Sequence, residues 1–93
     1  MTATRNDIVG WLEEAKQKGA THLIVACDTW DHDNYPVYVM PGEDVRQKAV
    51  EHGYDLENNR PMENGNMQVV DEVYSMAKPV EDQLSQRRAL NFD

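Results

Sequence analysis

The sequence has 93 residues, which is the length of one small domain. Nine lysines and arginines stand against 17 aspartates and glutamates, so the formal net charge is −8, while 40% of the residues are hydrophobic. That apolar content can form a modest core, which excludes wholesale disorder. The acidic excess excludes a duplex-DNA binder held by phosphate contacts and a protein that docks on anionic membrane. The acidic surface is then either ordinary solvated surface, a nucleic-acid mimic or a docking surface for a basic partner.

A first helix is predicted over residues 5–18. Thr4 can cap it, and Asp7 three positions later makes a variant of the capping box and favours the positive helix start. Gly19 predicts the end of the helix, because a terminal residue with positive φ is usually glycine. The apolar residues follow the spacing of one helix face, so Trp11 is expected in the core. These residues are Ile8, Trp11, Leu12 and Ala15.

Two strands are predicted next. Residues 21–27 are almost all apolar after His22, which is typical of a strand buried on both faces. A polar loop occupies residues 28–35, and a second strand is predicted over 36–40. Pro36 has no N–H to donate to a ladder, which fits the first position of this strand. Consecutive strands with a short connection most simply pair as an antiparallel hairpin.

The chain has a single cysteine, Cys27, at the end of the first predicted strand. One thiol cannot form an internal disulfide, and there is no CxxC pair to hold a metal, so Cys27 is expected to be a small buried hydrophobe. The longest uninterrupted apolar run has five residues, which is too short for a membrane span or a secretory signal. With a lone free thiol, these features predict a cytoplasmic protein.

Three further helices are predicted after the hairpin. The second helix covers residues 43–52 and stops at a glycine, and a loop with little periodicity follows over 54–65. The third helix covers 66–77 with Asn66 as N-cap. Its wide apolar face is formed by Met67, Val70, Val73, Tyr74 and Ala77. A last helix is predicted over 80–90, after Lys78-Pro79 has broken the third.

The predicted fold class is therefore α+β. Residues 1–93 form a small single domain in which an antiparallel β-hairpin packs with three to four helices, in the order α-β-β-α-α-α. A two-stranded hairpin is marginal by itself and needs further elements to cover it. We therefore expect a homo-oligomer, in which dimerisation either extends the sheet or buries the wide face of the third helix.

The loop at residues 28–35 carries the densest group of polar and aromatic side chains. Three carboxylates and an imidazole could hold a metal, but neither the glycine nor the glutamate of a calcium loop follows Asp31 and Asp33. Turn formation is the alternative role for these residues. Trp30 either packs back on the domain or makes an exposed contact with a partner protein or a base. Recognisable catalytic motifs are absent, so we predict no enzyme, no cofactor and no metal site.

Arg87 and Arg88 form a local basic pair near the end of the chain. If the last helix approaches Arg46 on the second helix, these arginines could bind a phosphate or a carboxylate through bidentate contacts. Tyr38 and Tyr74 could then supply a stacking wall, although each could equally belong to the core. Solvated helix surface is the alternative for the arginines.

The stretch GATHLIVACDTWDHDNYPVYVMPGEDV, at residues 19–45, resembles a family of short proteins of tailed bacteriophages and prophages. Residues 66–74 and 83–92 resemble the same family. No motif of that family fixes an activity, so the resemblance implies a biological context and not a chemistry.

The resemblance implies an accessory binding protein in the cytoplasm of the host cell. In one hypothesis it counters host defence by sequestering a small nucleotide-like signal at a subunit interface, where aromatic side chains stack on bases and the arginines contact phosphates. In a second, it is a stoichiometric inhibitor that docks its acidic surface and the Trp30 loop on a host protein. A metal-dependent hydrolase that uses Asp28, Asp31 and His32 is a third hypothesis. The predicted ligand-binding residues are Asp28, Thr29, Trp30, Asp31, His32, Tyr35, Tyr38, Arg87 and Arg88.

Overall fold

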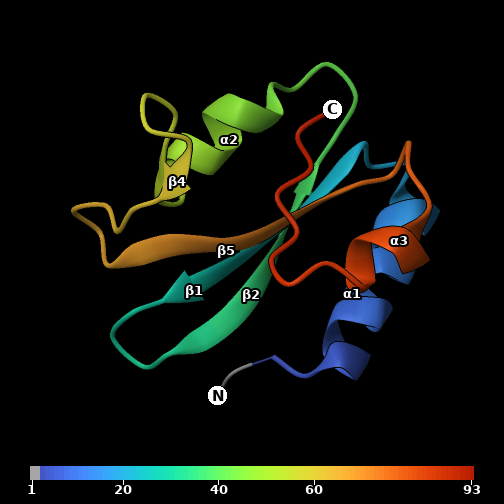
Figure 1. The fold of residues 1–93 in the computed structure, drawn as a ribbon, viewed down its shortest axis with the longest axis horizontal. Helices are drawn as coiled ribbons and strands as arrows, with labels where there is room; N and C mark the ends of the chain where they lie inside the picture. Colours follow the sequence, from blue (N-terminus) through green and yellow to red (C-terminus); the bar gives the residue numbers. More distant parts are fainter. Residues whose placement is uncertain (1–2) are drawn as a thin grey trace.

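The computed structural model describes residues 3–93 and confirms the α+β fold class. A three-stranded antiparallel sheet with the order β2-β1-β5 forms the centre, and a separate two-stranded sheet joins β3 and β4 (Figure 1). The elements are α1 (Arg5–Lys18), β1 (His22–Asp28), β2 (Asp33–Val39), α2 (Val45–Glu51), β3 (Tyr54–Asp55), β4 (Arg60–Pro61), β5 (Gln68–Ser75) and α3 (Val80–Leu84).

Helix α1 has the bounds and both ends that its sequence predicts. The Thr4 hydroxyl oxygen accepts from the Asp7 N–H at 3.2 Å, and the Asp7 carboxylate accepts from the Thr4 N–H at 2.9 Å, which completes the capping box. Gly19 ends the helix at φ 75°, a left-handed conformation that glycine adopts without steric cost. Both ends of the helix are thus encoded locally.

Strands β1 and β2 form the predicted antiparallel hairpin, in a register that places His22 opposite Val39 and Asp28 opposite Asp33. Strand β2 begins three positions before its predicted start, so Pro36 lies inside the strand and not at its first residue. The proline is tolerated there because β2 has a hydrogen-bonded neighbour on one side only.

The predicted third helix at residues 66–77 is wrong, because Gln68–Ser75 is strand β5, antiparallel to β1. The register shifts between Val25 and Ala26, which leaves Asp71 as an extra residue in β5. This bulge puts Val70 and Val73 on the same face of the sheet although they are three positions apart, a spacing that a helix would also produce. The third strand of the sheet therefore comes from the same chain, and no third-helix face exists for a dimer to bury.

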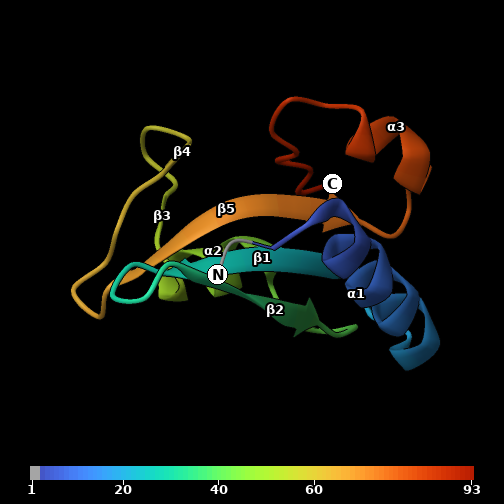
Figure 2. The same cartoon turned by 90° about the horizontal axis from the view of Figure 1, so that it is seen from below.

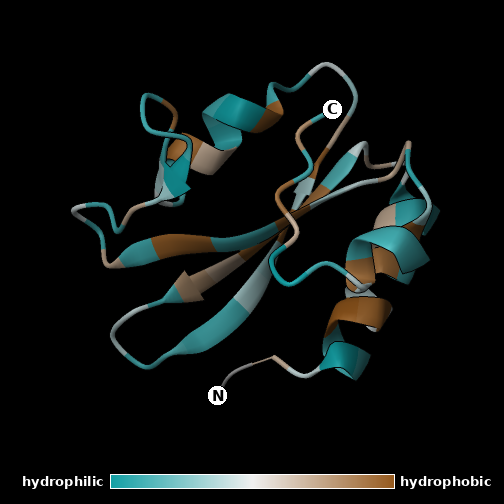
Figure 3. Cartoon of the chain, in the orientation of Figure 1, coloured by the Kyte–Doolittle hydropathy of each residue, from teal (hydrophilic) through white to brown (hydrophobic). Residues whose placement is uncertain are grey.

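The sheet separates two cores (Figures 2 and 3). On one face, Leu23 and Val25 of β1 pack with Leu12 and Ala15 of α1, and Trp11 is partly buried against this core as expected. On the opposite face, Ile24 of β1 packs with residues of α2, β3 and β5. The residues of this part of the chain alternate between the two cores, because Tyr38 and Met40 pack on the first core while Val37 and Val39 pack on the second.

Helix α2 lies within its predicted range, with Asp44 as N-cap and Val45 and Ala49 buried. The segment that follows is not only a loop, because β3 and β4 pair within it. Gly53 joins α2 to β3 at φ 105°, and an added Cβ would lie 2.2 Å from the carbonyl oxygen of Gln68. The backbone of β5 approaches here so closely that no larger residue fits.

The last helix is much shorter than predicted, because α3 ends at Leu84. The chain turns and bends over residues 85–88 and then meets the outer edge of β5, where the Val73 N–H donates to the Ala89 carbonyl at 2.7 Å and the Asn91 N–H donates to the Val73 carbonyl at 2.9 Å. Main-chain hydrogen bonds to β5 thus take the place of further helical turns in this segment.

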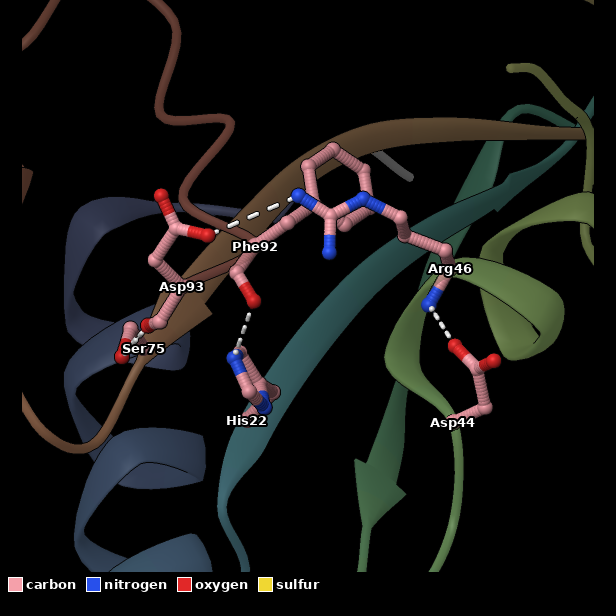
Figure 4. Close-up of polar contacts among 6 residues, drawn as sticks. All are labelled: His22, Asp44, Arg46, Ser75, Phe92 and Asp93. Carbon is pink, nitrogen blue, oxygen red and sulfur yellow. Dashed lines mark hydrogen bonds and ion pairs between the residues drawn. The ribbon is translucent and has the colours of Figure 1, made fainter.

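The end of this segment contacts residues of β1, β5 and α2 (Figure 4). His22 Nε2 lies 2.9 Å from the carbonyl oxygen of Phe92, and the Ser75 hydroxyl donates to the carbonyl of Asp93. The Arg46 guanidinium lies 3.5 Å from the Asp93 carboxylate and 5.3 Å from the centre of the Phe92 ring. Arg46 therefore anchors this segment on α2.

Candidate functional site

The turn between β1 and β2 is built from its own aspartates. The Trp30 N–H donates to Asp28 Oδ1, and the Asp33 N–H donates to Asp31 Oδ1, each at 2.9 Å. The His32 N–H donates to the Asp28 carbonyl at 2.7 Å, and His32 has a positive φ of 62°. Two of the three predicted candidate carboxylates therefore form the turn, as the structural alternative proposed.

Trp30 lies at the tip of this turn with 78% of its surface exposed, so the alternative in which it packs back on the domain is wrong. The neighbouring Thr29 N–H donates to the Met67 carbonyl at 2.9 Å, which fixes the turn against the segment before β5. Met67 is also exposed. A hydrogen-bonded turn thus presents a large exposed aromatic side chain, and it is joined to the segment that carries a second exposed apolar one.

Exposed apolar side chains and acidic charge gather at the same end of the molecule. Among residues 3–93, five of the six exposed large hydrophobic side chains belong to residues 28–33 and 50–67, which we call the acidic end. They are Trp30, Val50, Leu56, Met62 and Met67. Both ribbon views place the β1–β2 turn and the segment before β5 side by side at this end (Figures 1 and 2).

The acidic end carries most of the net negative charge of the chain. Residues 28–33 contribute three aspartates, and residues 50–67 contribute four carboxylates against one arginine, so the two segments hold −6 of the net −8. The predictions from sequence found only the first of these segments. Residues 50–67 also carry a signal in the sequence, because acidic residues and methionines cluster there in a stretch without periodicity. The position of this segment beside the Trp30 turn, however, depends on the fold.

The two predicted tyrosines of β2 do not share a site. Tyr35 faces α2, where its hydroxyl lies 3.0 Å from His52 Nδ1, whereas Tyr38 faces α1 and donates to Glu14 at 3.4 Å. Burial raises the pKa of both tyrosines and lowers the pKa of His52. Neither tyrosine is therefore available as an open stacking surface for the Trp30 loop.

Arg87 and Arg88 line a cavity of about 280 Å³ on the α1 side of the sheet. Its wall also contains two carboxylates, and its lining residues are Ala3, Ile8, Val25, Asn34, Asp71, Glu72, Arg87 and Arg88. The predicted aromatic wall is absent from this lining, because Tyr74 is buried and donates to Glu72 at 2.9 Å. Arg46 does not join the arginines, since it is paired with Asp93.

The remaining predicted chemistry has little geometric support in residues 3–93. No group of three histidine, cysteine, aspartate or glutamate side chains in that range is arranged to hold a metal ion, so Asp28, Asp31 and His32 do not form a ligand set. Cys27 is half-buried and not fully buried as expected, and its pKa is raised by desolvation and by nearby Asp71. A protonated thiol is a poor nucleophile.

The chain matches no family model, no curated protein and no solved structure. Among the helices formed by residues 3–93, none is both long enough and apolar enough to cross a membrane.

Proposed function

We propose that this protein is a binding module that docks its acidic end on a basic surface of a partner protein. The observation that carries the proposal is the coincidence of charge and apolar exposure at the acidic end, with Trp30 78% exposed at its tip. Small soluble domains rarely gather their exposed apolar side chains in one place unless another molecule covers them. Tryptophan is among the residues most enriched at the energetic centre of protein interfaces.

The turn that carries Trp30 supports this function because it is already ordered. Side-chain and main-chain hydrogen bonds hold residues 28–33, and the bond from Thr29 to Met67 joins the turn to the second segment. An ordered turn loses little conformational entropy when it binds, so more of the contact energy becomes affinity.

The charge of the acidic end supports a basic partner. Opposite potentials speed association and disfavour partners of the wrong sign, and both effects weaken as salt screens the charges. The resemblance to phage proteins leads us to propose further that the partner is a protein of the bacterial host cytoplasm and that docking inhibits it stoichiometrically.

Binding of proteins from a bacterial lysate to the immobilised full chain tests the proposal. Proteins retained at low ionic strength are identified, purified and titrated against the wild-type chain, Trp30→Ala and Val9→Ala. We expect Trp30→Ala to weaken binding by about tenfold or more. Val9→Ala should not change it, because Val9 is exposed on α1, away from the acidic end. If no retained protein distinguishes Trp30→Ala from the wild type, the proposal is wrong.

We propose a second candidate function because Arg87 and Arg88 share a cavity. Two guanidinium groups can bind the phosphate of a small nucleotide-like signal. Since the cavity has no aromatic wall of its own, a second subunit would have to supply the stacking surface for the base. This hypothesis therefore requires a homo-oligomer.

Thermal-shift measurements with a cyclic dinucleotide and with ADP-ribose test the second function, together with the molar mass from light scattering. A ligand at a hundredfold excess over its Kd adds about 2.7 kcal/mol of stability, which raises the Tm. The double variant Arg87→Gln/Arg88→Gln should lose the shift, whereas Arg60→Gln, on the distant β4, should keep it. A monomer of 10.7 kDa with no shift would overturn this function.

A further inference from the structure

The acidic end contains a cavity of about 270 Å³ that neither the turn nor Trp30 lines. It lies where the end of α2 meets β3 and β4. Val50, Tyr54 and Met62 give it apolar walls, and Asp55 and Glu63 place carboxylates among its lining residues. Met62 is 54% exposed, so the cavity opens to solvent beside an unusually exposed thioether.

The walls of this cavity are held by the main chain. The Gly53 carbonyl accepts from the Met62 N–H at 3.2 Å and from the Val70 N–H at 3.0 Å, which ties β4 and β5 to the end of α2. Asn64 completes the frame, since its side-chain amide donates to the Glu51 carbonyl at 3.1 Å and to Gln68 Oε1 at 3.1 Å. The cavity is therefore preformed in the chain without a partner.

The two carboxylates of the cavity differ in their hydrogen bonds. Asp55 accepts from the N–H of Glu57 at 3.0 Å and from the side-chain amide of Asn58 at 2.7 Å, so it serves the local turn. The hydrogen bonds with Asn58 hold the pKa of Asp55 below its usual value, which keeps this carboxyl charged. Glu63 makes no hydrogen bond or ion pair with any residue in the described range 3–93. One charged group at the cavity is thus available to an incoming cation.

We propose that this cavity binds a single lysine or arginine side chain of the partner protein. The long aliphatic stem of such a residue fits walls formed by Val50 and Met62, and its cationic head meets Glu63. A purely aliphatic side chain would contact the apolar walls but would leave the carboxylates without a counter-charge. An acidic side chain would be repelled by the same carboxylates. This inference rests on the proposed docking function, because it names the chemistry of the partner at one point of that interface.

A titration by NMR tests the cavity without a partner. The full chain carries ¹³C-labelled methionine methyl groups, and the probes are the N-acetyl methylamides of lysine, arginine and norleucine. We expect the lysine and arginine probes to shift the Met62 methyl resonance, with a Kd of about 1 mM or weaker, as befits a single side chain. Norleucine has the same stem without the charge and should bind several-fold more weakly. Equal binding of norleucine, or no shift with any probe, would overturn the inference.

Two variants locate the charge effect. Glu63→Gln should weaken the lysine probe about threefold or more, whereas Glu57→Gln should leave it unchanged because Glu57 does not line the cavity. Equal effects of both variants would mean that general surface charge attracts the probe, and the assignment to this cavity would fall.

The same titration separates this inference from the docking function. Trp30→Ala should bind the lysine probe as the wild type does, because Trp30 does not line the cavity. Lysine binding in a chain that has no Trp30-dependent partner would keep the cavity and overturn the docking function. A Trp30-dependent partner with no lysine binding would keep the function and overturn the cavity.

Discussion

The turn between β1 and β2 and the turn between β5 and α3 use polar side chains in opposite ways. In the first turn, Asp28 and Asp31 bond to main-chain N–H groups two residues ahead, at the surface. In the second turn, Gln83 is 1% exposed, accepts from the Ser75 N–H at 2.7 Å and donates to the Ser75 carbonyl at 2.8 Å. The first turn leaves Trp30 in solvent, whereas in the second the buried Gln83 side chain holds α3 against the end of β5.

The two turns differ in how much stability the protein loses when one of their side chains is replaced. A buried polar side chain that forms hydrogen bonds with main-chain groups is needed for stability, because its removal leaves those groups without partners. An exposed side chain on a turn that folds by itself is available for recognition.

Gln83→Ala should cause the largest loss of stability. It leaves the buried Ser75 N–H without its side-chain acceptor and removes the bonds to Lys78 and Pro79, so we expect a cost of about 2–4 kcal/mol. Urea unfolding followed by circular dichroism measures it. Gln17→Ala, at an exposed position of α1, is the matched control and should change stability by less than about 0.5 kcal/mol. Equal costs for both variants would contradict the proposed role of Gln83 in holding α3 against β5.

Asp28→Ala should cost about 1 kcal/mol, because the exposed turn loses the acceptor for the Trp30 N–H but no buried group is left unpaired. Asp28→Asn keeps a side-chain oxygen and should retain most of that stability while removing the charge. The two variants therefore separate the turn from the electrostatics. A loss as large as that of Gln83→Ala would show that the two turns do not differ in the way described.

Lowering the pH should lower the free energy of unfolding through the protonation of His52, which lies in the acidic end. Burial lowers the folded-state pKa of His52, so the folded protein binds this proton less readily than the unfolded chain does. The contribution of neutral His52 is complete above a pH of about 6.5, the unfolded pKa, and is lost as the pH falls through the folded pKa. The Tm should fall between pH 7.5 and about 5.5, and His52→Gln should flatten that slope. An unchanged slope in the variant would contradict this assignment.

Trp30→Ala should have the smallest effect on stability, within about 0.5 kcal/mol of the wild type, because the side chain is 78% exposed. Its effect should instead appear in binding. Thermal unfolding of the same samples used for the binding assay measures both quantities on one variant. A large fall in Tm would mean that Trp30 stabilises the fold, which would remove the main support for the docking proposal.

The elements that could be predicted from sequence are those whose signals are local. Thr4, Asp7 and Gly19 determine the two ends of α1 within the helix itself, and the apolar run of β1 needs no distant partner to be recognised. Strand β5 could not be predicted in this way. Its bulge at Asp71 produces helix-like spacing, and its pairing with β1 joins residues 40 to 53 positions apart.

The candidate site divides along the same line. The polar turn at residues 28–33 was visible in the sequence because turn residues cluster in it. The cavity beside Met62 and Glu63 was not visible, because its walls come from α2, β3 and the segment after β4, which the Gly53 carbonyl joins through its bond from the Met62 N–H. Likewise, Arg87 and Arg88 meet Asp71 and Glu72 only in the folded chain.

Pro36 has a consequence for how this small protein avoids aggregation. The outer side of β2 is the open edge of the central sheet, and the seven-residue strand would be a template for a neighbouring chain if every main-chain N–H were present. Pro36 removes a donor at the middle of that strand, while hydrogen bonds from residues 89–91 cover the other edge at Val73. Two copies therefore have no continuous ladder to share, and we expect concentrated solutions to resist fibril formation. A strand added at the open edge of β2 would lack a main-chain donor at Pro36.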